Sequence, residues 1–157
     1  MKFSRIAILL VIAVCSAFII INAVPSSNNE LDIEYLNTPS AANLPFSKAV
    51  RVGNMLYLSG ELGFDYTTGK LVTGGIKEET LKLMENLKIT LEQFGSSLDR
   101  VVKCSIMIKD MNEWKNFNEV YVTYFDKDKL PARCAWGASA LALDARVEID
   151  CIAVINP

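Results

Sequence analysis

The stretch PARCAWGASALALDARVEIDCIAV, residues 131–154, contains the pattern that decides the fold. In its second half every other residue is apolar, at Val147, Ile149, Cys151 and Ala153. Glu148 and Asp150 occupy the alternate positions, so the segment predicts a strand with one buried face. The alternation weakens at Ile152 and Val154, which share the parity of Glu148. A partly covered edge strand would explain these two residues, but we favour an open sheet face that subunits of the same kind bury.

Further strands and two helices are predicted around this segment. Strands are expected at 48–52, 55–59, 101–108, 133–138 and 146–155, and helices at 77–94 and 112–125. The short apolar piece 31–36 would dock as one more strand, and FDYTTG at 64–69 indicates a turn or loop. The order β-β-α-β-α-β-β predicts a single α+β domain with a mixed sheet and two helices on one face.

The second predicted helix carries an aromatic stripe at Trp114, Phe117, Tyr121 and Tyr124. Aromatic residues at helical spacing are more typical of core packing than of a box around a ligand. We therefore assign this stripe to the core.

Histidine is absent from all 157 residues, which excludes several classes of protein. Ser-His-Asp and Cys-His mechanisms, HExxH zinc proteases and His-containing zinc fingers all require it. The remaining candidates for chemistry are carboxylates, Arg, Lys, Tyr, Ser, Thr, Cys and backbone amides. We expect neither a metal nor a cofactor.

The first 24 residues have the pattern of an export signal. Lys2 and Arg5 precede an apolar run at residues 6–24, and a signal peptide and a retained signal anchor both fit a run of this length. A buried core helix is the less favoured alternative, because the run has no polar face. Residues 25–43 are rich in Ser, Asn and Pro and are expected to form a polar linker before a domain at 44–157. These segments predict an exported protein, periplasmic or secreted, or one anchored in the membrane through residues 6–24 with its domain outside the cytoplasm.

The charge balance argues against a nucleic-acid partner. The formal net charge of the chain is −2, and it falls to −4 without the segment that carries Lys2 and Arg5. No run of basic residues interleaved with aromatics is present. Beyond the apolar run the cysteines are Cys104, Cys134 and Cys151, without a CxxC motif. We expect them to be unpaired core residues, one disulfide or a reactive thiol being the alternative.

Three places would hold polar groups rigidly. Arg133 begins a predicted strand, Glu148 lies between two apolar residues of another, and Ser59-Gly60 ends a third. Glycine at such a position lets a ligand approach the backbone closely. Each feature also has a structural explanation: a solvated arginine, a surface glutamate and an ordinary turn.

From about residue 37 to 155 the chain resembles the reactive-intermediate deaminase family, also called Rid or YjgF. The resemblance is carried in order by VGNMLYLSGELGFDYTTGKLV, ENLKITLEQFG, SSLDRVVKCSIMIKDMNEWKNFNEVY and PARCAWGASALALDARVEIDCIAV. It implies a chorismate-mutase-like α+β fold, a homotrimer and a family that is mostly intracellular. The same fold also hosts members without deaminase activity.

The resemblance also implies an activity and its residues. Active members bind a small 2-imino acid between two subunits, and water hydrolyses the imine to a 2-keto acid and ammonia. The carboxylate-binding arginine of the P-A-R motif matches Arg133, and the acidic residue near the attacking water matches Glu148. Ser59 and Gly60 match the family's S-G pair, and Asn118 matches the asparagine of N-E-x-Y.

The chain departs from the family at several positions. Phe46 stands where active members commonly have Tyr, so it can stack on a planar substrate but has no hydroxyl. Cys134 replaces the small polar residue that usually follows the arginine, and Ala135 stands where the family often has its reactive Cys, so that position has no sulfur. Alternation along the strand would direct the side chain of Cys134 away from that of Arg133, into the core. Glu61 replaces a common Gln and would add a negative charge near the site. A non-catalytic module that binds a small carboxylate is therefore the alternative to a deaminase.

Overall fold

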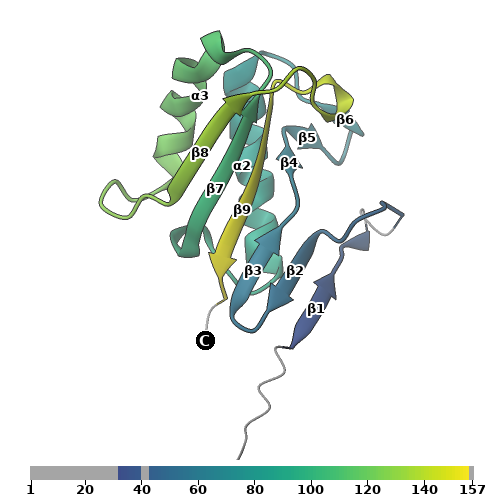
Figure 1. Cartoon of the computed structure of the whole chain (residues 1–157). Coiled ribbons are helices and arrows are strands. Elements are labelled where there is room, and N and C mark those ends of the chain that lie inside the picture. Colours follow the sequence, from purple (N-terminus) through teal and green to yellow (C-terminus); the bar gives the residue numbers. More distant parts are fainter. Residues whose placement is uncertain (1–31, 40–42, 156–157) are drawn as a thin grey trace, which may run out of the picture. The chain divides into compact units, whose positions relative to one another are not determined.

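In the computed structural model, which describes residues 32–39 and 43–155, strand β9 (Val147–Val154) lies inside a mixed sheet (Figure 1). The strand order is β1-β2-β3-β9-β7-β8, with β4 also paired to β9. Strands β7 and β8 are parallel, whereas the other pairs are antiparallel. The strands are β1 (Ile33–Leu36), β2 (Ala49–Val52), β3 (Met55–Leu58), β4 (Glu61–Leu62), β7 (Val101–Ile108) and β8 (Ala132–Gly137). The predicted α+β class and mixed sheet are confirmed.

Two helices, α2 (Ile76–Gln93) and α3 (Trp114–Tyr121), pack on the same face of this sheet, as predicted (Figure 1). The second helix is shorter in its α form than the sequence pattern predicts. Single turns of 3-10 helix at Met111–Glu113 and Val122–Tyr124 account for the rest.

The core lies between the helices and one face of the sheet. The alternate residues of β9 that point to the helices, Val147, Ile149, Cys151 and Ala153, are at most 1% exposed. They pack with Leu83, Leu87 and Phe117, none of which is exposed. Burying such a side chain contributes roughly 1.5–3 kcal/mol, so this layer supplies much of the stability of the fold.

The other face of the sheet is not covered by any helix in the described part of the chain. Strand register places Tyr57 beside Ile152, and Trp136 beside Met107. Tyr57 and Trp136 are 44% and 45% exposed. The second apolar face predicted from Ile152 and Val154 therefore exists, and none of the described helices covers it.

Several local details refine the predicted elements. FDYTTG forms the turn of a small hairpin, β5 (Phe64–Asp65) with β6 (Lys70–Leu71). The short strand expected at 31–36 is β1, which pairs with β2 at the sheet edge. A bulge in β7 shifts the register between Val101 and Lys103, so Val102 is exposed instead of joining the core. The export segment expected at residues 1–24 lies outside the described residues.

Candidate active site

Arg133 is held in a fixed orientation at the edge of the sheet. It pairs in register with the core residue Cys104, so its side chain lies on the helix side of β8. Its Nη1 donates a 2.7 Å hydrogen bond to Oδ1 of Asn118 on α3. The guanidinium carbon also lies 4.7 Å from the ring centre of Trp114 and 5.0 Å from that of Tyr121. No described carboxylate pairs with Arg133, so its oriented positive charge is available to an anionic ligand.

The aromatic stripe of α3 serves both the core and this arginine. Phe117 and Tyr121 are 0% and 3% exposed, as expected for core residues. Trp114 and Tyr121 also form the surface on which the guanidinium of Arg133 stacks. The Tyr121 hydroxyl is buried and has no hydrogen-bond partner among the described residues. Burial, followed by the neighbouring Cys104 thiol, raises the pKa of Tyr121 far above its ordinary value, so this hydroxyl stays neutral.

Glu148 lies on the opposite, open face of the sheet. Its register partners are Leu62 on β4 and Met107 on β7. The carboxylate makes no hydrogen bond or ion pair with any described residue. Burial raises its pKa above the ordinary glutamate value, and the negative charges of Asp150 and Glu61 raise it further. Glu148 is therefore a better proton acceptor than a solvated glutamate.

Gly60 is in direct contact with Glu148. A Cβ added at Gly60 would overlap the Oε1 of Glu148 and lie 2.8 Å from its Cδ. Only glycine, which has no Cβ, leaves room for the carboxylate at this position. Ser59 has a different role, because its hydroxyl donates to the carbonyl of Ser47 at 2.7 Å and its N–H donates to that of Lys48 at 3.0 Å.

The structure thus brings the predicted residues together in two separate groups. Arg133 and Asn118 form one group on the helix side of the sheet edge, and Gly60 and Glu148 form the other on the open face. Phe46, in the segment before β2, is 48% exposed. Because the groups point to opposite sides of the sheet, one chain does not bring Arg133 and Glu148 to the same small ligand.

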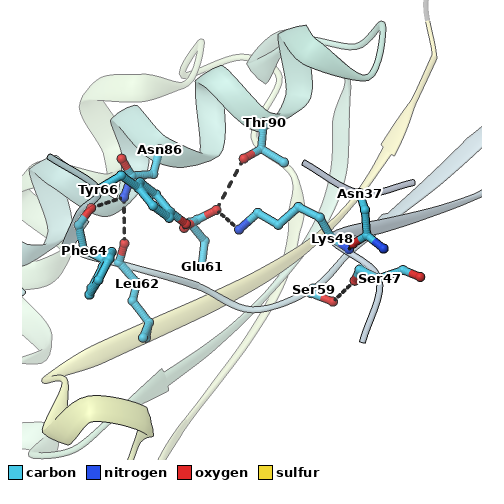
Figure 2. Close-up of polar contacts among 10 residues, drawn as sticks. All are labelled: Asn37, Ser47, Lys48, Ser59, Glu61, Leu62, Phe64, Tyr66, Asn86 and Thr90. Carbon is cyan, nitrogen blue, oxygen red and sulfur yellow. Dashed lines mark hydrogen bonds and ion pairs between the residues drawn. The ribbon is translucent and has the colours of Figure 1, made fainter. Parts of the chain in front are cut away.

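The sequence reasoning missed a buried ion pair next to the Gly60 group. Lys48 Nζ lies 2.6 Å from Oε2 of Glu61, and the two side chains are 10% and 3% exposed (Figure 2). Burial disfavours the charge of Lys48, but the Glu61 carboxylate more than offsets this and raises the pKa of Lys48. Lys48 offsets part of the charge that was expected to repel anions, and that repulsion stays a prediction. The opposite charges of Lys48 and Glu61 could have suggested an ion pair, but the sequence does not show that the two side chains are in contact.

The cysteines fulfil the expectation of buried, unpaired residues only in part. Cys104 and Cys151 are buried in the core as cross-strand neighbours, with their sulfurs 2.9 Å apart. The hydrogen bond to Cys104 and burial raise the pKa of the Cys151 thiol. The prediction that Cys134 points into the core is wrong: Arg133 takes the helix side of β8, so Cys134 is exposed on the other. The described residues contain no cluster of three or more metal-ligating side chains.

Comparison with known proteins agrees with this architecture. The sequence model of the family described as Endoribonuclease L-PSP matches residues 36–155. A mouse protein named 2-iminobutanoate/2-iminopropanoate deaminase is 43% identical over 74% of this chain and 86% of its own length. A RutC family protein of Pyrococcus abyssi is 43% identical over 69% of the chain and 85% of its own length. The structure of YyfA, a Rid family protein from Yersinia pestis, covers 79% of the chain and 100% of its own, with 33% identity and a TM-score of 0.74.

These findings correct the predicted localisation. The relatives match the domain that follows the apolar run. Within residues 32–39 and 43–155, no helix is both long and apolar enough to cross a bilayer. The comparison with these relatives contradicts the prediction of an exported or membrane-anchored domain.

The matched region spans every strand from β2 to β9 and both helices, and it contains the P-A-R, VEID and S-G segments that carried the resemblance. The two relatives are 43% identical to this chain, and the matches cover 85% and 86% of their lengths. This similarity shows common descent. The chain belongs to the reactive-intermediate deaminase (Rid, YjgF) family.

Proposed function

We propose that the protein hydrolyses small 2-imino and enamino acids to 2-keto acids and ammonia. The observation that carries the proposal is the fixed guanidinium of Arg133, held by Asn118 and two aromatic rings without an acidic partner. A planar guanidinium binds a carboxylate through two parallel hydrogen bonds. The name of the mouse relative supports the same substrate class.

The site would form between subunits of a homotrimer. Arg133 and Glu148 face opposite sides of the sheet, so a second copy must supply one of them. The open face, with Tyr57 and Trp136 about half exposed, is the surface that such a copy would cover. A closed ring of three chains would repeat this heterologous contact at each interface.

The reaction requires little more than orientation and proton transfer. Arg133 would hold the substrate carboxylate, and the protonated C=N carbon is already electrophilic. As a water oxygen bonds to that carbon, Glu148 would accept one of the water protons and pass it to the nitrogen. The C–N bond then breaks while Glu148, once more a carboxylate, accepts the remaining hydroxyl proton, so ammonia leaves and a C=O group forms. The raised pKa of Glu148 suits a group that takes up and returns a proton.

The first experiment compares Arg133→Ala with Arg51→Ala in an assay that generates 2-iminopropanoate in solution. Two charge-assisted hydrogen bonds are worth about 3 kcal/mol or more, so Arg133→Ala should lower turnover about a hundredfold or further. Arg51 is a matched control because it is a half-exposed arginine on β2 that pairs with Glu34. Unchanged turnover in folded Arg133→Ala protein would refute the assignment.

The alternative is a carboxylate-binding protein without catalytic activity, and Phe46 is the observation that favours it. This side chain is 48% exposed and brings no hydroxyl to the site. In that case the native protein would show no rate above solvent hydrolysis, while 2-oxobutanoate would still raise the melting temperature. A large gain in rate on Phe46→Tyr would show that the missing hydroxyl limits catalysis.

A further inference from the structure

We propose that the buried Lys48–Glu61 ion pair is a positioning device that holds the Gly60 backbone against Glu148 in the catalytic cleft. The inference rests on the proposed function, since it assigns a role within that site. Neither residue of the pair touches the reacting groups directly. Both are therefore positioning residues.

The pair is buried, and further hydrogen bonds hold its carboxylate. Oε2 of Glu61 accepts from Lys48 Nζ at 2.6 Å and from the Thr90 hydroxyl at 3.4 Å, and Oε1 accepts from the Tyr66 hydroxyl at 3.1 Å (Figure 2). Lys48 and Glu61 are 8% and 3% exposed. A buried ion pair contributes little net stability over an apolar pair of the same size, but it demands one geometry. In the proposed site, this single geometry would fix the position of the Gly60 backbone.

The backbone around Gly60 is tied to the Lys48 segment on both sides. On the N-terminal side, Ser59 donates its N–H to the Lys48 carbonyl and its hydroxyl to the Ser47 carbonyl. On the C-terminal side, Glu61 is bound through its side chain to Lys48 Nζ. Gly60 is the single residue between these two anchors, so it cannot shift without breaking one of them.

A second set of bonds fixes the chain that continues from Glu61. Nδ2 of Asn86, on α2, donates to the carbonyls of Leu62 and Phe64 at 3.0 and 2.8 Å. Thr90, one turn further along α2, reaches Glu61. The helix thus holds the segment from Glu61 to Phe64 (Figure 2), while Lys48 binds Ser59 and Glu61, the residues on either side of Gly60.

The consequence for the site follows from the contact between Gly60 and Glu148. Gly60 abuts the Glu148 carboxylate, so its position limits where that carboxylate can lie. By fixing Gly60, the ion pair therefore also restricts Glu148, and small misplacements of reacting groups are costly in rate.

Two double variants separate positioning from simple stabilisation. K48A/E61A removes both charges and the link, whereas K48Q/E61Q removes the charges but keeps two side chains that can hydrogen-bond to each other. Neither leaves a buried unpaired charge, so both are expected to fold. The exposed pair Lys88–Glu92 on α2, 56% and 55% exposed, supplies the matched control K88A/E92A.

With 2-iminobutanoate generated in solution, K48A/E61A should lower kcat about tenfold or more and change KM less than about threefold, because Arg133 is unaffected. K48Q/E61Q and K88A/E92A should stay within about threefold of the native kcat. A purely structural pair would lower only the melting temperature, so native kcat in folded K48A/E61A would overturn the proposal. Loss of kcat in K48Q/E61Q equal to that in K48A/E61A would also overturn it, because the link would then be irrelevant.

An NMR measurement keeps this test independent of the activity. In protein labelled with 15N-glycine, the Gly60 amide signal should shift in both double variants, because residue 61 is its neighbour, but should broaden by conformational exchange in K48A/E61A only. A Gly60 signal in K48A/E61A that is no broader than in K48Q/E61Q would refute positioning even if the native protein proved inactive. A native protein that is inactive but shows the expected Gly60 changes would refute the proposed function alone.

Discussion

The two faces of strand β9 differ although they alternate along the same eight residues. Toward the helices, Val147, Ile149, Cys151 and Ala153 are buried almost completely. Toward the open side, Glu148, Asp150, Ile152 and Val154 are only half buried. The first face is covered by the helices, whereas the second holds a carboxylate with a raised pKa. A single strand thus carries a face that stabilises the fold and a face with the carboxylate that we propose for catalysis.

The largest expected effect is on the helix-covered face. Ile149→Ala should lower the free energy of unfolding by about 2–5 kcal/mol, because it leaves a cavity in a fully buried layer. Ile89→Ala is the control, since Ile89 on α2 is 59% exposed and its loss should cost less than about 0.5 kcal/mol. Urea unfolding monitored by circular dichroism gives both values. Equal costs would mean that the two environments do not differ as described.

On the open face the expected effect is on assembly. Tyr57→Glu should weaken self-association about tenfold or more, which corresponds to about 1.4 kcal/mol, because it brings a charge to a surface that another copy would cover. Leu81→Glu is the matched control, since Leu81 on α2 is 43% exposed and Tyr57 is 44% exposed. Sedimentation velocity over a range of concentrations measures the change. A Tyr57→Glu protein that still forms trimers would show that the open face is not the interface.

Among the described residues, Tyr121 carries the one buried side-chain polar atom that lacks a hydrogen-bond partner. Its hydroxyl is buried without a hydrogen-bond partner. Tyr121→Phe should therefore raise the free energy of unfolding by about 1 kcal/mol, because it removes an unsatisfied polar group and keeps the ring under Arg133. Thermal unfolding measures this change. A loss of stability would instead mean that a water or a partner chain satisfies the hydroxyl.

The smallest expected effect is the pH dependence at Glu148. Its raised pKa means that folding favours the protonated form, so the favourable contribution is present below the ordinary glutamate pKa and is lost as pH rises through the folded value. Glu148→Gln, which stays neutral, should match the native melting temperature near pH 4 and equal or exceed it at pH 7, although turnover is lost. A native protein more stable than Glu148→Gln at pH 7 would contradict the raised pKa.

Most of the fold could be predicted because it follows from local patterns. The strand predicted at 101–108 is β7 itself, and the hairpin around Gly53 is formed by β2 and β3. The left-handed φ of 58° at Gly53 is what such a tight turn requires. The bulge at Val102 was not predictable, because it depends on how β7 and β9 pair and not on β7 alone.

For the candidate site, the sequence names individual residues but does not give their arrangement. Arg133 and Glu148 were identified from their motifs, yet their opposite orientations depend on the register of β8 and β9 against β7. The direction of Cys134 was wrong for the same reason. The Lys48–Glu61 pair joins residues 13 positions apart, one just before β2 and the other on β4, and no periodicity in the sequence indicates this contact.

The contact between Gly60 and Glu148 also says what a substitution at position 60 would cost. A methyl group there would overlap the carboxylate where it now lies. The overlapping atoms are the far end of a flexible side chain, so Glu148 could swing aside and the fold would be kept. Glycine at position 60 therefore preserves the place of the carboxylate rather than the stability of the domain.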